Sequence, residues 1–549
     1  MTPQDLTEVM TTIKHCLRFQ TQPVPLSDPK SVIGNALQCS QTLLNTFKTS
    51  PSLTYIQLET LWQQKPATYQ WFDLGLLVLV SRANQLSDTF IQHAMAGWLI
   101  ANQVKTLANK VERQQLYSEI MRCVSGQHFG TLRIGIKQKL GVNICETVQR
   151  SRAFDSLSMS IKIAATLKQS KRTSLSSLAR VLNQMILQYP QYQPLLNPFL
   201  DPSSEFFAGI VVKVEKEAEF IVGAKDGKIL LASLTKQDSN ETTITIRHIN
   251  ATKLLPKLTI QRRVSSAALL QVWSLASPKQ REHLTAIRQP AKYSIQYPPT
   301  DLLMILDALN KTNIEPTELT KLIGQNSFFT DVLQRSATEL NRLNINVSNL
   351  KQSIMTHGTE RLAAVLTEHL LWQRLSMSHF PLSEQFEQLC ILHRQVCASI
   401  AEFCKLGIPQ QFSLSALLQL SGLFTTSSLR ILNHWCLANT DLSNAKSLTG
   451  DNIDIDFDKQ ALTLAKSWHQ GREIHAPFNC YNRHAKSTNV YRDVQAISLY
   501  LCRQWLHCGP ALTPTLPEEL QHHCNRIKLN NEHIELLVER HCQAMYQPI

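Results

Sequence analysis

The chain has 549 residues, of which 43% are hydrophobic and 18% charged, a balance typical of a globular protein that buries large cores. Its formal net charge is +13, so an anionic partner is compatible with the composition. The longest apolar run, Leu74–Val80, is far shorter than the ~20 residues that cross a bilayer, which argues against a transmembrane helix. The 17 glycines are few for an all-β architecture.

The amino terminus and the cysteines bear on localisation. The first residues, MTPQDLTEVM, contain neither the basic stretch nor the apolar run of a secretory signal. The 13 cysteines include no CxxC pair and do not form the framework of a small secreted protein. We therefore expect a cytoplasmic protein with reduced thiols and without membrane insertion.

Hydrophobic periodicity predicts helices over residues 1–198. In the segment Phe90–Val104, apolar residues recur at helical spacing and mark one buried face. From about 205 to 255 the pattern changes to short β-branched and aromatic runs, and Asp226-Gly227 between two of them is a strong signal for a tight turn. The following segment, ITIRHI, alternates with period two. We therefore predict a small antiparallel β unit near 205–255.

Helical periodicity returns after residue 264 as a string of short helices. Its clearest apolar stripe comprises Leu302, Ile305, Leu306 and Leu309. Pro316 suits the first turn of the next helix, because proline has no amide hydrogen to leave unbonded there. Asn326 stands where a cap would begin the following helix, and Ser348 is a candidate cap for the one after it. Gly358 is expected to end that helix in a left-handed turn.

The passage Leu302–Leu371 resembles the HDOD family, the HD-related output domain of bacterial signalling proteins. It carries in order the leucine stripe and the segments IEPTELTKLI, NSFFTDVLQRSA and VSNLKQSIMTHGTERLAAVL. The chain departs from the family where Asn326-Ser327 replaces Asp-Pro. The resemblance covers about residues 280–445 and implies a helical module that transmits signals or bridges partners.

A second and weaker resemblance, to the metal-dependent cyclic-dinucleotide phosphodiesterases of the HD-GYP class, covers about residues 80–235. The helix that carries His93 resembles the helix of the first metal ligand. The string Gln127-His128-Phe129-Gly130 falls where the family has His-Asp-Ile-Gly. Together the two resemblances imply tandem HD-like helical domains, the amino-terminal one degenerate.

These observations predict a mainly α fold with a small antiparallel β unit between two helical parts. The expected segments are a degenerate HD-GYP-like helical domain at 1–198, a β-rich unit at 199–262, an HDOD-like domain at 263–449, and a helical extension at 450–549 that packs on the HDOD-like domain.

The metal chemistry of the HD families needs a His, an adjacent His-Asp pair and a distant Asp, which hold ions that activate water. No His-Asp dipeptide and no Gly-Tyr-Pro tripeptide occurs in this chain. Thr425-Thr426 stands where the HDOD-like half would carry His-Asp, and threonine hydroxyls are poor neutral ligands. We therefore predict no catalytic residue, no metal site and no cofactor.

Histidines and cysteines gather near the carboxy terminus. The cluster comprises His522, His523, Cys524, His533, His541 and Cys542, with Cys480, His484, His507 and Cys508 upstream. A structural zinc site needs roughly four convergent ligands, usually paired at short separations, and these positions match no standard spacing. We interpret them as faces of ordinary helices. The GxSxG nucleophile elbow and the phosphate-binding glycine loops are also absent from the sequence.

The sequence thus predicts a non-enzymatic bacterial signal-transduction protein that acts through regulatory protein partners, with a cyclic dinucleotide as a further partner that the resemblance allows. The alternatives are a nucleic-acid-binding regulator that uses the +13 charge and a residual metal-dependent cyclic-dinucleotide phosphodiesterase. Binding measured at rising salt separates the first alternative from the main hypothesis. Incubation with cyclic dinucleotides and manganese or iron tests the second.

Overall fold

A computed structural model gives the structure of the chain. It describes residues 11, 28–49, 74–75, 77–78, 81–82, 84–107, 109–126, 129–142, 153–159, 161, 186–188, 190, 193, 210–214, 217–225, 228–236, 242–250, 259–263, 295–311, 314–340, 347–435, 442–449, 455–479, 489–508 and 516–545.

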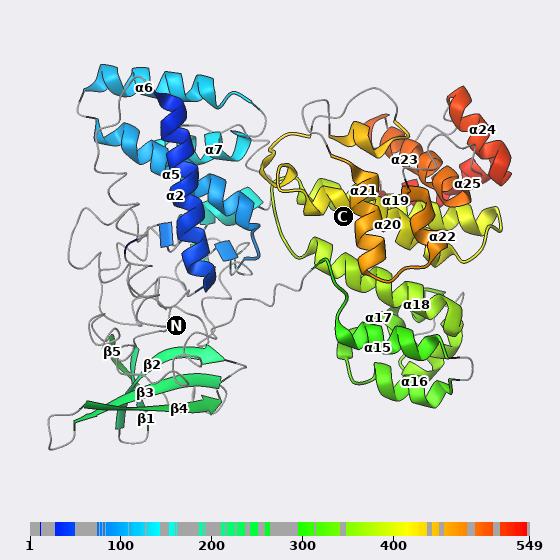
Figure 1. Ribbon diagram of the computed structural model, residues 1–549, viewed down its shortest axis with the longest axis horizontal. Helices are drawn as coiled ribbons and strands as arrows, with labels where there is room; N and C mark the ends of the chain where they lie inside the picture. Colours follow the sequence, from blue (N-terminus) through cyan, green and yellow to red (C-terminus); the bar gives the residue numbers. More distant parts are fainter. Residues whose placement is uncertain are drawn as a thin grey trace. The chain divides into compact units, whose positions relative to one another are not determined.

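The chain forms two compact units, which we describe separately (Figure 1). Unit 1 comprises Met1–Lys292 with the short segments His379–Pro381 and Ile431–Asn433. Unit 2 comprises Tyr293–Ser378, Leu382–Arg430 and His434–Ile549. Among the described residues, no helix combines the length and the apolar character that crossing a membrane requires.

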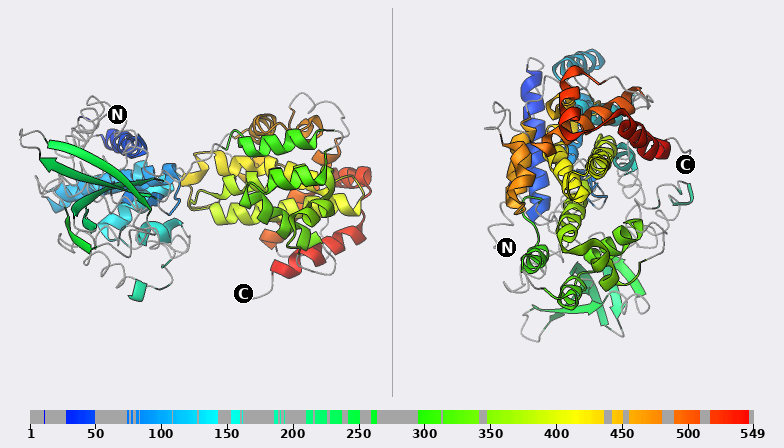
Figure 2. Two further views of the ribbon diagram at one scale, coloured as in Figure 1. Left: turned by 90° about the horizontal axis from the view of Figure 1, so that it is seen from below. Right: turned by 90° about the vertical axis from the view of Figure 1, so that its right-hand side faces the viewer.

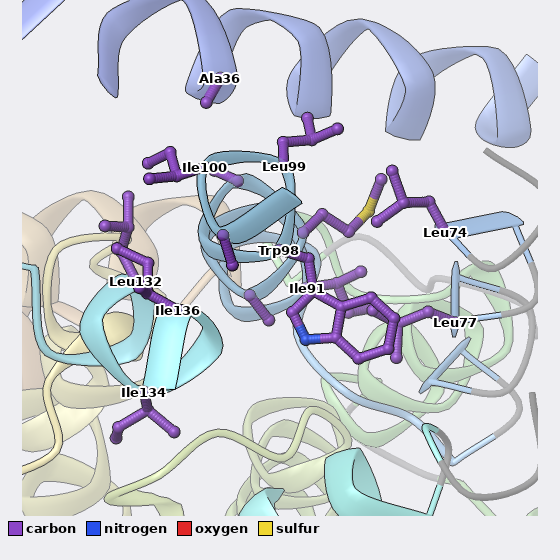
Figure 3. Packing of buried hydrophobic residues seen from close by; sticks show 14 of the residues in the cluster. Ala36, Leu74, Leu77, Ile91, Trp98, Leu99, Ile100, Leu132, Ile134 and Ile136 are labelled. Carbon is purple, nitrogen blue, oxygen red and sulfur yellow. The ribbon is translucent and has the colours of Figure 1, made fainter. Parts of the chain in front are cut away.

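The helices of unit 1 include α2 (Pro29–Thr49), α5 (Asp88–Thr106), α6 (Lys110–Cys123) and α7 (Gly130–Leu140). The predicted helix at Phe90–Val104 is confirmed as α5, which begins where the Ser87 side chain accepts a hydrogen bond from Phe90 N at 3.3 Å. Helix α5 is buried along most of its length and packs between α2 and α7. Figure 3 shows Ala36 of α2 pointing toward Leu99 and Ile100 of α5.

Two glycines let α5 and α7 approach each other closely. A Cβ atom at Gly97 would lie 2.5 Å from the Leu132 carbonyl oxygen, and one at Gly135 would lie 2.8 Å from the Ala94 carbonyl oxygen. Both distances are shorter than any ordinary van der Waals contact, so only glycine permits this helix packing.

Alanine at Gly97 is therefore expected to lower the free energy of unfolding by about 1–3 kcal/mol, because the added methyl group forces the two backbones apart. Gly34 of α2 is the matched control, since no neighbouring atom lies within 4 Å of a Cβ built there. Gly34→Ala is expected to raise the free energy of unfolding by about 0.5–1 kcal/mol. Denaturant titration of both variants makes the comparison, and equal effects would contradict the role given to Gly97.

The predicted antiparallel β unit is confirmed as a five-stranded sheet (Figure 2). Its strands are β1 (Ile210–Val214), β2 (Glu217–Lys225), β3 (Lys228–Lys236), β4 (Thr242–Asn250) and β5 (Thr259–Arg263). Their order is β4-β3-β2-β1-β5, and each neighbouring pair is antiparallel. Strands β2 and β3 remain paired up to Lys225 and Lys228, the two residues that flank the predicted Asp226-Gly227 turn. The turn itself lies outside the described residues.

The described residues of unit 2 are mainly helical. They include α15 (Thr300–Leu309), α16 (Pro316–Ile323), α17 (Ser327–Leu340), α18 (Leu350–Ser376), α19 (Ser383–Phe403), α20 (Pro409–Thr425), α21 (Phe457–Ser467), α22 (Arg472–His475), α23 (Val490–Cys508), α24 (Glu518–Ile527) and α25 (Asn531–Met545), with the 3-10 helices η6 (Leu429–Ile431), η7 (Ala445–Leu448) and η8 (Ala476–Phe478). The mainly helical fold class is thereby confirmed.

Local signals in the sequence located several helix boundaries in this part. Pro316 begins α16 as predicted, and the Asn326 side chain accepts a hydrogen bond from Phe328 N at 3.1 Å at the start of α17. The cap of α18 is Asn349 rather than the expected Ser348, because the Asn349 side chain accepts from Lys351 N at 2.9 Å. Gly358, with a φ of 69°, is non-helical and divides the range of α18 into two helical segments, so the helix that begins at Leu350 ends there as predicted.

Helices α19 and α20 form the centre of unit 2. Every residue of α20 from Phe412 to Phe424 is buried, and α18, α19 and α21 pack against it (Figure 1). Helices α23 and α25 pack on α19. Several buried residues of α20 are nonetheless polar, among them Ser413, Ser415 and Gln419. Buried polar groups need hydrogen-bond partners, and the partners of these side chains define the candidate site.

Candidate functional site

A polar network crosses the apolar centre of unit 2. The imidazole of His393, on α19, has no exposed surface. Its Nε2 atom lies 2.9 Å from Gln419 Oε1 on α20, and its Nδ1 atom lies 2.9 Å from Ser498 Oγ on α23. One side chain therefore connects the three helices that surround it.

Burial holds this imidazole neutral. It lowers the pKa of His393 from 6.5 to about 4, because an imidazolium ion would lose its hydration there. A neutral ring carries one proton and the amide oxygen of Gln419 can only accept, so with this amide orientation the proton lies on Nε2, which donates to Gln419 Oε1, while Nδ1 accepts from the Ser498 hydroxyl. The Ser498 hydroxyl also lies 3.1 Å from the His393 carbonyl oxygen, its second possible acceptor.

A second buried amide lies on α23. Gln495, only 3% exposed, donates from Nε2 to Ser415 Oγ on α20 at 2.8 Å. Gln419 and Gln495 thus resemble each other in environment, since each uses one end of its amide to bond a side chain of the helix core. The other ends, Gln419 Nε2 and Gln495 Oε1, have no hydrogen-bond partner within the described part of the chain.

Both amides line a pocket of about 260 Å³. Its lining residues come from the α20, η7, α21, η8, α23 and α24 regions and are Gln419, Ser443, Asn444, Ala445, Lys446, Phe457, Asp458, Pro477, Arg492, Gln495, Ala496 and His523. The buried side chains of Phe457 and Pro477 supply apolar surface, and the two amides supply hydrogen-bonding groups. Concave sites with apolar walls and a few converging polar groups are typical ligand sites.

Two cations belong to the exposed part of this lining. Arg492 lies in the first turn of α23, three and four residues before Gln495 and Ala496, so the three residues share one helix face. The Asn489 side chain caps this helix by accepting from Tyr491 N at 3.0 Å. Lys446 lies in η7, and neither its ammonium group nor the Arg492 guanidinium forms an ion pair or a side-chain hydrogen bond with any described residue. The pocket therefore offers two positive charges to an anion, against the one carboxylate of its lining, Asp458.

A charged group supports the pocket wall at His523. Asp493, 2% exposed, lies 2.5 Å from His523 Nδ1 and also accepts from Arg526. Arg526 compensates the buried carboxylate, as such a group requires. Asp493 and Arg526 thereby fix the ring of His523 against the pocket.

The two residues predicted at the degenerate HD position have structural partners. Thr425 and Thr426 end α20, where the Thr425 hydroxyl donates to the Ser421 carbonyl oxygen at 3.1 Å. The Thr426 hydroxyl and the Gln460 side-chain amide lie 3.2 Å apart and bond each other. Thr425 Oγ1 also lies 3.3 Å from Gln460 Oε1, so both threonines help to dock α21 on α20.

In unit 1, His93 lies on α5, and burial lowers its pKa to about 4. Gln127 and His128, which stand at the family's His-Asp position, lie outside the described residues. Across the part of the chain that is described, no three His, Cys, Asp or Glu side chains form a group that could hold a metal ion.

The carboxy-terminal histidines and cysteines have separate partners. His523 bonds Asp493, His533 stacks on Phe403 with ring centroids 5.9 Å apart, and His541 Nε2 lies 3.0 Å from Ser399 Oγ. Burial raises the pKa of the Cys524 thiol to about 11, which disfavours the nucleophilic thiolate at neutral pH. Cys480 and His484 lie outside the described residues.

No motif in the sequence predicted the pocket. Its residues extend from 419 to 523 and match no spacing motif. One signal was nevertheless present, because Gln419 is a lone amide in the otherwise small and apolar segment SALLQLSGLF.

Comparison with family models, with curated proteins and with solved structures found no match to this chain.

Proposed function

We propose that this chain is a non-catalytic regulatory protein whose unit 2 binds a small anionic molecule in the pocket between α20, α21 and α23. The observation that carries the proposal is the lining of the pocket. Two cations that form no ion pair or side-chain hydrogen bond with any described residue, Arg492 and Lys446, lie there with two buried amides. A carboxylate or phosphate group matches the cations, and hydrogen bonds from charged donors are the stronger ones. The amides would orient the rest of the molecule.

The lining favours binding over catalysis. The amides of Gln419 and Gln495 neither ionise nor act as nucleophiles at neutral pH. They are also held by His393 and Ser415 in the helix core, so their positions do not depend on a ligand. A preorganised site of this kind loses little conformational entropy when it binds. The resemblance to HDOD proteins suggests that partner proteins respond to the occupied unit.

Removing both pocket cations is the direct test. The double variant Lys446→Ala/Arg492→Ala is expected to bind anionic ligands at least about tenfold more weakly, since each charge-assisted hydrogen bond contributes about 1.5–3 kcal/mol. Calorimetric titration of the full chain with inorganic phosphate, ribose 5-phosphate and the four common nucleoside monophosphates measures this at low and at physiological salt.

The matched control is Lys351→Ala/Arg361→Ala, which removes two exposed cations from α18 that do not line the pocket. This control is expected to bind as the wild type does. Equal losses in both double variants would indicate a general effect of net charge. If no probe binds the wild type, the proposed function is wrong.

A second candidate, acid–base chemistry on the bound molecule, is favoured by one observation. Asp493 lies 2.5 Å from Nδ1 of His523, and a carboxylate in that position orients an imidazole that serves as a general base. Incubation of the full chain with phosphate monoesters and diesters tests it. Product release that disappears in His523→Gln would replace the binding proposal with a hydrolase.

A further inference from the structure

The orientation of the Gln419 amide depends on His393. While Nε2 of the neutral imidazole carries the proton, the amide must turn its oxygen toward that nitrogen, at 2.9 Å. The amide then presents its NH₂ group to the pocket. With the imidazole proton on Nε2, this position of the pocket is therefore a hydrogen-bond donor.

Gln495 presents the opposite function. Its NH₂ group donates to Ser415 Oγ at 2.8 Å, which leaves the carbonyl oxygen for the pocket. The pocket thus carries one donor and one acceptor, from side chains of the neighbouring helices α20 and α23. A ligand that satisfies both needs an acceptor and a donor on one edge, as in an amide, a lactam or an amidine.

Shape and charge narrow the class of molecule further. Phe457 and Pro477 give apolar surface on which a flat ring can pack. Arg492 and Lys446 match a phosphate group. At about 260 Å³ the pocket is at the small end of ligand sites, which typically measure roughly 300–1,000 Å³. This size favours one nucleotide over two.

We propose that the ligand is a nucleoside monophosphate whose base edge is read by Gln419 and Gln495, with His393 as the positioning residue that fixes the Gln419 amide. This inference rests on the proposed function and names the ligand class of the same site. Buried donors and acceptors discriminate strongly, because a ligand that lacks the matching group leaves them unpaired.

The test compares the four nucleoside monophosphates with ribose 5-phosphate, which keeps the sugar and the phosphate but lacks the base. In calorimetric titration of the full chain, at least one nucleoside monophosphate is expected to bind about tenfold or more tightly than ribose 5-phosphate. Equal affinities would overturn the inference while the proposed function stands. Failure of every anionic probe to bind would overturn both.

Two isosteric variants separate the loss of the hydrogen-bond donor from the gain of a negative charge. Gln419→Glu keeps an oxygen for His393 Nε2–H but turns the donor that faces the pocket into an acceptor. Gln495→Glu adds the same negative charge and keeps an acceptor in the pocket. The new carboxylate repels the phosphate group that both ligands carry. We therefore compare the affinity ratio between the best nucleoside monophosphate and ribose 5-phosphate, in which this shared repulsion cancels.

We expect this ratio to fall close to one in Gln419→Glu. In Gln495→Glu it is expected to fall less and to stay clearly above one, because the carboxylate keeps the acceptor in the pocket although it loses the donor to Ser415. A wild-type ratio in Gln419→Glu would overturn the role given to that amide. Far-ultraviolet circular dichroism establishes that both variants are folded. If Gln419→Glu does not fold, the wild-type comparison with ribose 5-phosphate still decides the ligand class.

Discussion

Replacing Glu368 by alanine is expected to lower the free energy of unfolding by about 3–5 kcal/mol. Glu368, on α18, is only 5% exposed, and its Oε1 atom accepts hydrogen bonds from Arg394 Nε at 2.9 Å and from the Ser413 hydroxyl. The Arg394 side chain is itself 12% exposed and lies over the Trp372 ring, 5.2 Å from its centroid. Without Glu368 this guanidinium would remain buried without a counter-charge. An unpaired buried charge lowers the free energy of unfolding strongly.

A second ion pair of unit 2 provides the control. Arg540 Nη1 lies 2.8 Å from Glu402 Oε2, but these side chains are 45% and 58% exposed. Water screens such a pair, so Glu402→Ala is expected to change the free energy of unfolding by less than about 1 kcal/mol. Denaturant titrations followed by circular dichroism measure both variants. Similar small losses would mean that the Glu368 pair is hydrated and does not hold α18 on α19.

The second large effect is a loss of stability in acid that depends on His393. Burial lowers the pKa of His393 from 6.5 to about 4, so between these values the unfolded chain binds a proton that the folded chain does not. The contribution of His393 to the free energy of unfolding is therefore at its maximum above pH 6.5, and it is lost as the pH drops toward 4. One pKa unit corresponds to about 1.4 kcal/mol, so this group contributes a decrease of roughly 3 kcal/mol.

Burial also lowers the pKa of His93 and of His541 to about 4. The contribution of His393 is therefore measured as the difference between the wild type and a variant that lacks this histidine. Titrations at pH 7 and pH 4.5 are expected to give a smaller decrease for His393→Gln than for the wild type. His522→Gln, which changes an exposed histidine, is expected to keep the wild-type decrease. Equal decreases in all three proteins would show that His393 ionises normally in the folded state.

Much of the helical architecture could be predicted because apolar spacing records directly which face of a helix is buried. The stripe at Leu302 and Ile305 became the buried face of α15, and Pro316 began α16 through the chemistry of its own ring. Asn349 was missed as a cap because Ser348 and Asn349 are both good caps. Only the backbone geometry chooses between two adjacent candidates.

The candidate site could not be predicted in the same way, since its residues converge only in three dimensions. Gln419 and Arg492 lie in segments that the sequence assigned to different parts of the chain, the HDOD-like domain and the carboxy-terminal extension. The family motifs in the sequence point to ionisable metal ligands, whereas the pocket presents neutral amides. Such amides resemble surface residues until burial shows that they are held in place.

The order of the strands in unit 1 has a consequence for how the sheet assembles. Strands β1 to β4 are neighbours both along the chain and in space, so each hairpin closes a short loop at small entropic cost. Strand β5 instead returns to pair with β1, where Ile260 lies opposite Val212. This contact has the largest sequence separation in the sheet, and long-range pairings form late. Addition of β5 is therefore the natural slow step, after a four-stranded meander has already formed.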